Sequence, residues 1–126
     1  MKRCLCDTKL GQVHCVVAGS GSGTPLLLLH QTPRSVDEFA EVMPLLARER
    51  QVVAMDTPGY GCSDRVSGRP GVADYAGAAI DVLDALGIER VIVAGHPTGA
   101  IIAVEMAAAY PQSFAQAVLQ YIDAAP

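Results

Sequence analysis

Several features that would assign a protein to a functional class are missing from this sequence. Its 126 residues hold 9 lysine and arginine residues against 13 aspartate and glutamate residues, a formal net charge of -4, with no basic cluster. A surface that binds nucleic acid needs concentrated positive charge, so we exclude nucleic acid as a partner. The longest nearly apolar stretch, residues 100–110, is interrupted by Glu105. It is far shorter than the roughly 20 residues of a spanning helix, so we expect no membrane partner.

The amino terminus also lacks a targeting feature. Its first residues, MKRCLCDTKL, have no apolar middle section of the kind found in secretory signal peptides, which predicts a cytoplasmic location. The composition is 51% hydrophobic and 17% charged, which is typical of a core-forming globular protein and not of a disordered one. The length suits one domain and is too short for two, so we expect residues 1–126 to form a single domain.

Cysteine is present at four positions: Cys4, Cys6, Cys15 and Cys62. Cys4 and Cys6 alternate as the residues of a strand do. Together with His14 and Cys15 they suggest a zinc site at first sight, but C-x-C followed by H-C does not match the usual structural zinc spacings. We therefore expect reduced thiols with a structural role, no metal and no cofactor.

Short apolar runs alternate with amphipathic segments along the chain. The runs expected to be strands are residues 13–18, 26–30, 51–56, 91–94 and 117–122, preceded by the alternating amino-terminal segment. Residues 34–48, 74–86 and 98–110 have helical patterns, although Pro44 should interrupt the first. The segment 98–110 is apolar on nearly all sides and is expected to be buried. This alternation predicts an α/β fold with a mostly parallel sheet of about six strands and three main helices on both faces.

The glycine-rich segment GSGSGT, residues 19–24, resembles a phosphate-binding loop at first sight. Such a loop follows a strand and opens a helix, but here Pro25 and a strand come next, and Thr24 stands where the third glycine would be. We interpret this segment as a flexible turn.

Two polar segments follow strands at the end where open α/β sheets gather their ligand groups. HQTP, residues 30–33, either offers the Thr32 N–H as an oxyanion donor or is an ordinary connection in which Thr32 or Ser35 caps a helix. DTPGYGCSD, residues 56–64, is interpreted as a turn built from glycines.

A third segment, VIVAGHPTGA (residues 91–100), has the strand–turn–helix form in which hydrolases mount a nucleophile, framed by Gly95 and Gly99. The central residue is Pro97, which has no nucleophilic atom and cannot adopt the positive φ of such a turn. Proline does suit the start of a helix, so the turn should relax into a plain helix start and misplace the Thr98 N–H. We expect His96 to be packed and hydrogen-bonded, and the Thr98 hydroxyl to cap the helix or bond back to it.

Together these segments resemble the α/β-hydrolase family of the H-G-x-P type, as in haloalkane dehalogenases and epoxide hydrolases. LLLLHQTP resembles the oxyanion loop, MDTPGYGCSD the D-x-x-G-x-G-x-S segment, and VIVAGHPTGAIIAVEMAAAYP the nucleophile elbow with its helix. The resemblance covers nearly the whole chain. It implies a truncated α/β-hydrolase core without a cap domain, whose relatives hydrolyse esters, lactones, epoxides or carbon–halogen bonds. The implied ligand is a small apolar ester or a related molecule.

The departures from the family pattern concern the catalytic residues. Gln31 replaces a glycine, Pro97 replaces the nucleophilic serine or aspartate, and none of the three histidines stands at the catalytic position after the eighth strand. Asp123 matches the place after the sixth strand where some members carry the catalytic acid. Since a triad acts as a unit, we expect this chain to be inactive alone.

The resemblance implies a binding site around His30, Gln31, Thr32, His96 and Thr98. Two alternatives to a degenerate hydrolase remain: a non-catalytic binding module that uses Thr32 and Thr98 as donors, and one half of a split hydrolase. An exposed apolar sheet edge would favour self-association or pairing with a missing carboxyl-terminal half.

Overall fold

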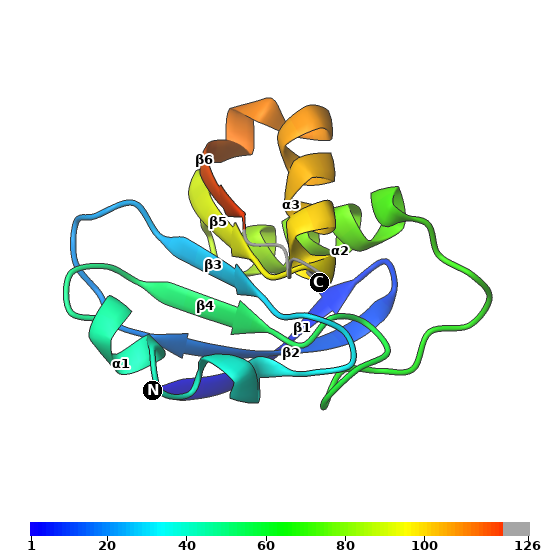
Figure 1. The fold of residues 1–126 in the computed structure, drawn as a ribbon, viewed down its shortest axis with the longest axis horizontal. Helices are drawn as coiled ribbons and strands as arrows, with labels where there is room; N and C mark the ends of the chain where they lie inside the picture. The colour runs from blue at the N-terminus through cyan, green and yellow to red at the C-terminus, as the bar shows by residue number, and fades with distance from the viewer. Residues whose placement is uncertain (120–126) are drawn as a thin grey trace, which may run out of the picture.

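A computed structural model describes residues 1–119, shown in Figure 1. The elements in chain order are β1 (Lys2–Thr8), β2 (Gly11–Ala18), β3 (Leu26–Leu29), η1 (Val36–Phe39), α1 (Met43–Leu46), β4 (Val52–Met55), α2 (Val72–Ala85), β5 (Val91–Gly95), α3 (Thr98–Ala109), η2 (Pro111–Ser113) and β6 (Phe114–Leu119). Within residues 1–119, every helix falls short of the length and apolar character needed to cross a membrane. The predicted acid Asp123 lies outside the described residues.

The strands form one sheet in the order β1-β2-β4-β3-β5-β6. The four strands β4, β3, β5 and β6 run parallel, and β2 joins β4 and β1 through antiparallel pairings. The prediction of a mostly parallel sheet of about six strands is confirmed. Because β3 lies between β4 and β5, the chain passes from β3 to β4 on one side and then crosses to β5 on the other side. This change of direction opens a crevice at the carboxyl ends of parallel strands.

Two separate apolar cores cover the two faces of the sheet, as the continuous apolar strands predict. In β3, Leu27 and Leu29 pack on the face covered by α2 and α3, whereas Leu26 and Leu28 pack on the face covered by η1 and α1. All four side chains are buried. Figure 1 shows α1 on the opposite side of the sheet from α2 and α3. The prediction of helices on both faces is therefore confirmed.

The segment 34–48 is not the single interrupted helix that its pattern predicts. It contains only the 3-10 turn η1 and the single-turn helix α1, joined by turns. Pro44 falls in the first turn of α1, where its missing N–H costs nothing, but the same missing donor prevents a helix from continuing through it from η1. Val36, Phe39 and Met43 of this segment pack against the sheet, whereas Ala40, expected on the same face, is exposed.

The two longer helices lie where the sequence predicts them, with one difference in each. α2 begins at Val72, two residues earlier than expected, because the Asp74 carboxylate accepts the Gly71 N–H at 2.8 Å and caps the amino end. α3 buries only one side: Ile102, Ala103 and Met106 are buried, whereas Ile101 and Val104 are 50% and 49% exposed. The expectation that α3 is buried on all sides is therefore wrong within the part of the chain that the structure describes.

Residues 19–24 form a bend between β2 and β3, which agrees with their interpretation as a turn.

The start of α3 approaches β3 and β5 with backbone against backbone. A Cβ atom on Gly99 would collide with the carbonyl oxygen and side chain of Leu29, and a Cβ atom on Gly95 would collide with the backbone of Gly99 and Ala100. Backbone atoms cannot rotate away as side chains do, so only glycine fits at these two positions. This contact fixes where residues 96–98 lie relative to the end of β3.

Replacing Gly99 by alanine tests this close approach. Alanine favours a helix by about 0.5–1 kcal/mol over glycine, but crowding at this site should cost about 1–3 kcal/mol, so Gly99→Ala should lower the free energy of unfolding. The matched control is Gly77→Ala inside α2, where the added Cβ meets only the flexible end of the Lys9 side chain. That variant should be equally stable or more stable in urea unfolding.

An outcome in which both variants gain stability would mean that the start of α3 has room for a side chain and does not sit against β3 as described.

Candidate functional site

The three polar segments singled out in the sequence meet at the carboxyl ends of β3, β4 and β5. His30 follows β3, Asp56 follows β4 and His96 follows β5, and these strands are neighbours in the sheet. Hydrogen bonds join each segment to another. The sequence therefore predicted correctly which segments come together, although it gave no contacts between them.

His30 connects the first two segments. Its Nδ1 is 2.7 Å from the Gln31 carbonyl oxygen, and its Nε2 is 2.9 Å from the Thr57 backbone nitrogen. A carbonyl oxygen only accepts and an N–H only donates, so Nδ1 carries the proton and Nε2 accepts. The ring is 1% exposed and packs edge-on against Tyr60. Both ring nitrogens of His30 are therefore used in hydrogen bonds. The side chain holds the first two segments together and is not available as a free base.

Glu38 connects the first and third segments. Its Oε1 accepts the Gln31 N–H at 3.1 Å, and its Oε2 lies 2.9 Å from His96 Nδ1. The prediction that His96 is hydrogen-bonded and packed is confirmed, since its side chain is 24% exposed. The sequence reasoning missed Glu38. The pattern Ser35-x-x-Glu38 would have suggested a capping box, but Glu38 reaches the neighbouring loops instead.

Pro97 stands at the turn between β5 and α3 with φ -48° and ψ -47°, and its carbonyl oxygen accepts hydrogen bonds from the Ala100 and Ile101 N–H groups. These are the values and bonds of an ordinary helix start. Within residues 1–119 only glycines have a positive φ, so the strained conformation of a nucleophile elbow is absent there. The expected relaxation of this turn is confirmed.

The Thr98 hydroxyl does not cap or bond back to its own helix, as the sequence reasoning expected. It accepts the Thr32 N–H at 3.3 Å, so it joins the loop after β3 to the start of α3. The helix cap in the loop after β3 comes instead from Ser35, whose hydroxyl accepts the Asp37 N–H at 3.4 Å. Thr32 and Thr98 therefore lie side by side.

Asp56 is the buried centre of the segment after β4 and is 1% exposed. Its Oδ1 accepts the Val36 N–H at 2.8 Å, and its Oδ2 accepts the Cys62 N–H at 2.8 Å and a bond from His14 Nδ1 at 2.9 Å. His14 Nε2 in turn accepts from Arg3 at 3.1 Å, so Nδ1 is the ring nitrogen that carries the proton. The segment is the turn that we expected, but it is organised by a carboxylate that we did not predict as important.

A pocket of about 300 Å³ opens beside these residues. Its lining is Thr32, Thr57, Tyr60, Pro70, Gly71, Val72, Tyr75, Thr98, Ile101 and Ile102. Most of these are apolar or aromatic, and three threonines supply the polar groups, which is typical of a site for a small molecule. Another hollow, of about 410 Å³, lies at the amino ends of β3 and β5 beside Leu26 and Ile92, where none of the predicted site residues is found.

Two groups of side chains within residues 1–119 bring possible metal ligands within 4.8 Å of one another: Cys4 with Cys6 and Cys15, and His14 with Asp56 and Cys62. In the second group the facing His14 and Asp56 atoms are already hydrogen-bonded to each other. The zinc set considered from the sequence does not form, because His14 bonds to Asp56 and Arg3 and takes no part in the cysteine group.

Comparison with known proteins agrees with this geometry. The family described as alpha/beta hydrolase fold matches residues 24–125. A fluoroacetate dehalogenase from Burkholderia sp is 39% identical over 117 residues, which cover 89% of this chain and 38% of that protein. A 2-hydroxymuconate semialdehyde hydrolase from Pseudomonas sp. (strain CF600) is 37% identical over 108 residues, covering 79% and 37% respectively.

Among solved structures, an epoxide hydrolase from an endophytic Streptomyces superimposes with a TM-score of 0.85 at 30% identity, covering 99% of this chain and 38% of that one. This chain spans about two fifths of the length of the curated relatives it matches.

Asp56→Asn tests the role of the buried carboxylate. The asparagine amide has the same shape as the aspartate carboxylate, but an NH₂ donor replaces one acceptor oxygen and faces N–H groups that donated to that oxygen. Each hydrogen bond lost in this way should cost about 1–3 kcal/mol of folding free energy. The control is Asp64→Asn, since Asp64 is exposed and accepts the Gln12 N–H at 2.8 Å. Urea unfolding should show a clear loss for Asp56→Asn and a change below about 1 kcal/mol for the control. Equal losses would show that burial of Asp56 is unimportant.

Proposed function

The chain belongs to the alpha/beta hydrolase fold family, and from this premise we propose that it forms the ligand-binding part of a hydrolase-type site without the covalent step. Relatives are named as a dehalogenase, a semialdehyde hydrolase and an epoxide hydrolase. In this chain the bound ligand is a small, mostly apolar molecule with one carbonyl or similar acceptor, such as an ester. The observation that carries the proposal is Pro97 at the centre of the turn after β5.

The absence of the covalent step follows from the chemistry at position 97. Covalent catalysis needs a nucleophile with a base in hydrogen-bond reach, and proline offers no nucleophilic atom. Of the three histidines in the chain, His14 and His30 use both ring nitrogens in other bonds, and His96 gives its Nδ1 to Glu38. These contacts support a site that has lost its nucleophile and in which neither His14 nor His30 is free to act as a base.

Binding is supported by the pocket and by the threonines that line it. The N–H of Thr32 makes only a long bond, 3.3 Å, to the Thr98 hydroxyl, so a ligand oxygen can compete for it. The Thr98 hydroxyl lies beside this N–H and carries a proton of its own that it can donate. A backbone donor and a hydroxyl donor beside an apolar pocket suit an ester carbonyl whose apolar groups lie against Tyr75 and Ile102.

A second candidate function is one half of an assembled hydrolase. The half-exposed Ile101 and Val104 lie on the outer side of α3, and exposed apolar side chains of this kind favour contact with another surface. In that case a second polypeptide, or a second copy of this chain, covers α3 or pairs with the sheet edge. Hydrolysis that begins only when such a partner is mixed in would favour this candidate over the first.

Ligand binding can be tested with two substitutions on one helix. Ile101 and Val104 are equally exposed on α3, but only Ile101 lines the pocket. With phenyl acetate as the probe, titration followed by amide shifts of Thr32, Thr57 and Thr98 should saturate. Ile101→Asp should weaken the affinity about tenfold, because it places a charge in an apolar pocket, and Val104→Asp should leave it unchanged.

Equal effects of the two aspartates would show that phenyl acetate does not occupy this pocket. If the amide shifts of the unsubstituted chain do not saturate with phenyl acetate, the proposed binding function is wrong.

Pro97→Ser tests whether the missing nucleophile is the only defect. A serine hydroxyl is a weak nucleophile without a base, so this variant should hydrolyse p-nitrophenyl acetate less than about tenfold faster than the unsubstituted chain, against the factor of about 10⁶ that a working triad nucleophile provides. Pro97→Ala controls for changes in folding. Substantial turnover by Pro97→Ser alone would mean that a base is already present in the chain.

A further inference from the structure

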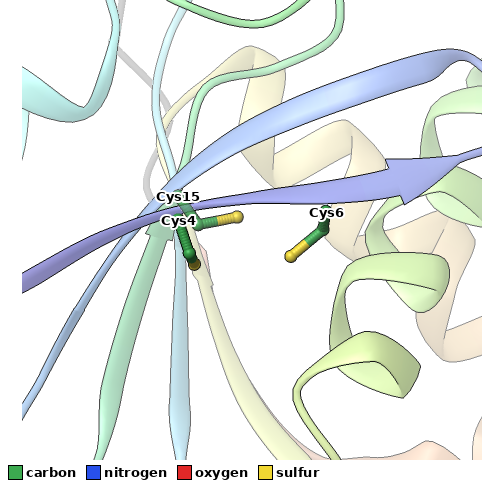
Figure 2. Close-up of side chains that lie close together, drawn as sticks. All are labelled: Cys4, Cys6 and Cys15. Atoms are coloured by element: carbon green, nitrogen blue, oxygen red, sulfur yellow. The ribbon is translucent and has the colours of Figure 1, made fainter.

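Three cysteine side chains gather on one side of the β1–β2 pair, away from the pocket described above. In the register of the two strands Cys4 lies opposite Cys15, and Cys6 is two residues further along β1 on the same face. Their three sulfur atoms all lie within 4.8 Å of one another. Figure 2 shows the Cys6 and Cys15 thiols pointing toward one another from the two strands. The strand pairing therefore builds a three-thiol cluster from residues that the sequence spacing alone does not assign to a site.

The three-thiol cluster is mostly buried but can be reached from solvent. Cys6 is 4% exposed and Cys15 is fully buried, and both belong to the main apolar core, whereas Cys4 is partly exposed and leaves a way in from solvent. All four cysteines of the chain are free thiols. Burial, with a smaller contribution from the neighbouring thiols, raises the pKa of Cys6 and Cys15 above the usual value. In the absence of a ligand these thiols are protonated at neutral pH.

Charge decides which thiophilic ion such a cluster can accept. Three thiolates around a monovalent or divalent ion leave a net negative charge beside an apolar core, and burial of an uncompensated charge is costly. A zinc ion additionally needs a fourth ligand. A trivalent ion that takes three sulfur ligands leaves no net charge, so it is the class that fits three buried thiols without further partners.

We propose that Cys4, Cys6 and Cys15 form a binding site for trivalent arsenic, taken up as arsenous acid. Three arsenic–sulfur bonds form and three arsenic–oxygen bonds break, and each thiol proton leaves with a hydroxide as water. Arsenic stays trivalent and the sulfurs stay at the thiolate level, so no oxidant or reductant is required.

The test is binding of arsenite to the full chain, followed by intact mass under non-denaturing conditions and by arsenic X-ray absorption. The unsubstituted chain should bind one arsenic atom, with only sulfur atoms in the first coordination shell. Cys4→Ser should weaken binding by more than about tenfold, because two thiols chelate less strongly than three. Cys62→Ser is the matched control, since Cys62 is exposed and outside the cluster, and it should bind as the unsubstituted chain does.

Cys4 is the chosen position because it is only partly buried, so the Cys4→Ser variant should remain folded. Thermal unfolding provides a second readout: arsenite should raise the melting temperature of the unsubstituted chain and of Cys62→Ser, but not that of Cys4→Ser. The proposal is overturned if Cys4→Ser binds as tightly as the unsubstituted chain, if Cys62→Ser loses binding, or if arsenic retains oxygen neighbours.

Discussion

The candidate site depends first on the backbone contact between the start of α3 and the ends of β3 and β5. Gly95 and Gly99 have no side chain to hold these segments apart, so residues 96–98 lie directly beside the loop after β3. That closeness lets the Thr98 hydroxyl accept the Thr32 N–H. The close approach therefore requires glycine at both positions that flank the turn, and Pro97 lies between them.

Two carboxylates then tie the loops around that frame. Glu38 holds the loop after β3 and His96, and Asp56 holds the loop after β4, the start of η1 and His14. Each carboxylate accepts two or three donors, and bonds to charged acceptors are stronger than neutral ones. This network holds the three loops together. Pro97 fits a normal helix start and disturbs none of these bonds.

The sequence was sufficient to predict the α/β class, the strands, the two long helices and the three segments that meet at the site. Those features follow from apolar periodicity and from the local effects of proline and glycine, which act within a few residues. It was not sufficient for the contacts of Glu38, Asp56 and Thr98, because they join residues that are distant in sequence. The same reason explains the cysteine cluster, which depends on the register of β1 against β2. The partial exposure of α3 was missed because apolar composition does not say whether a second surface is present.

The central claim is the proposal that this chain binds a ligand at a hydrolase-type site and has no nucleophile there. Its most direct test is the intact mass of the chain after incubation with a fluorophosphonate, a reagent that labels activated hydroxyl nucleophiles. The account predicts no covalent adduct, because Pro97 offers no hydroxyl and the Thr98 hydroxyl is hydrogen-bonded to the Thr32 N–H and not to a histidine ring among residues 1–119. An adduct that maps to Thr98 or to another pocket residue would contradict it.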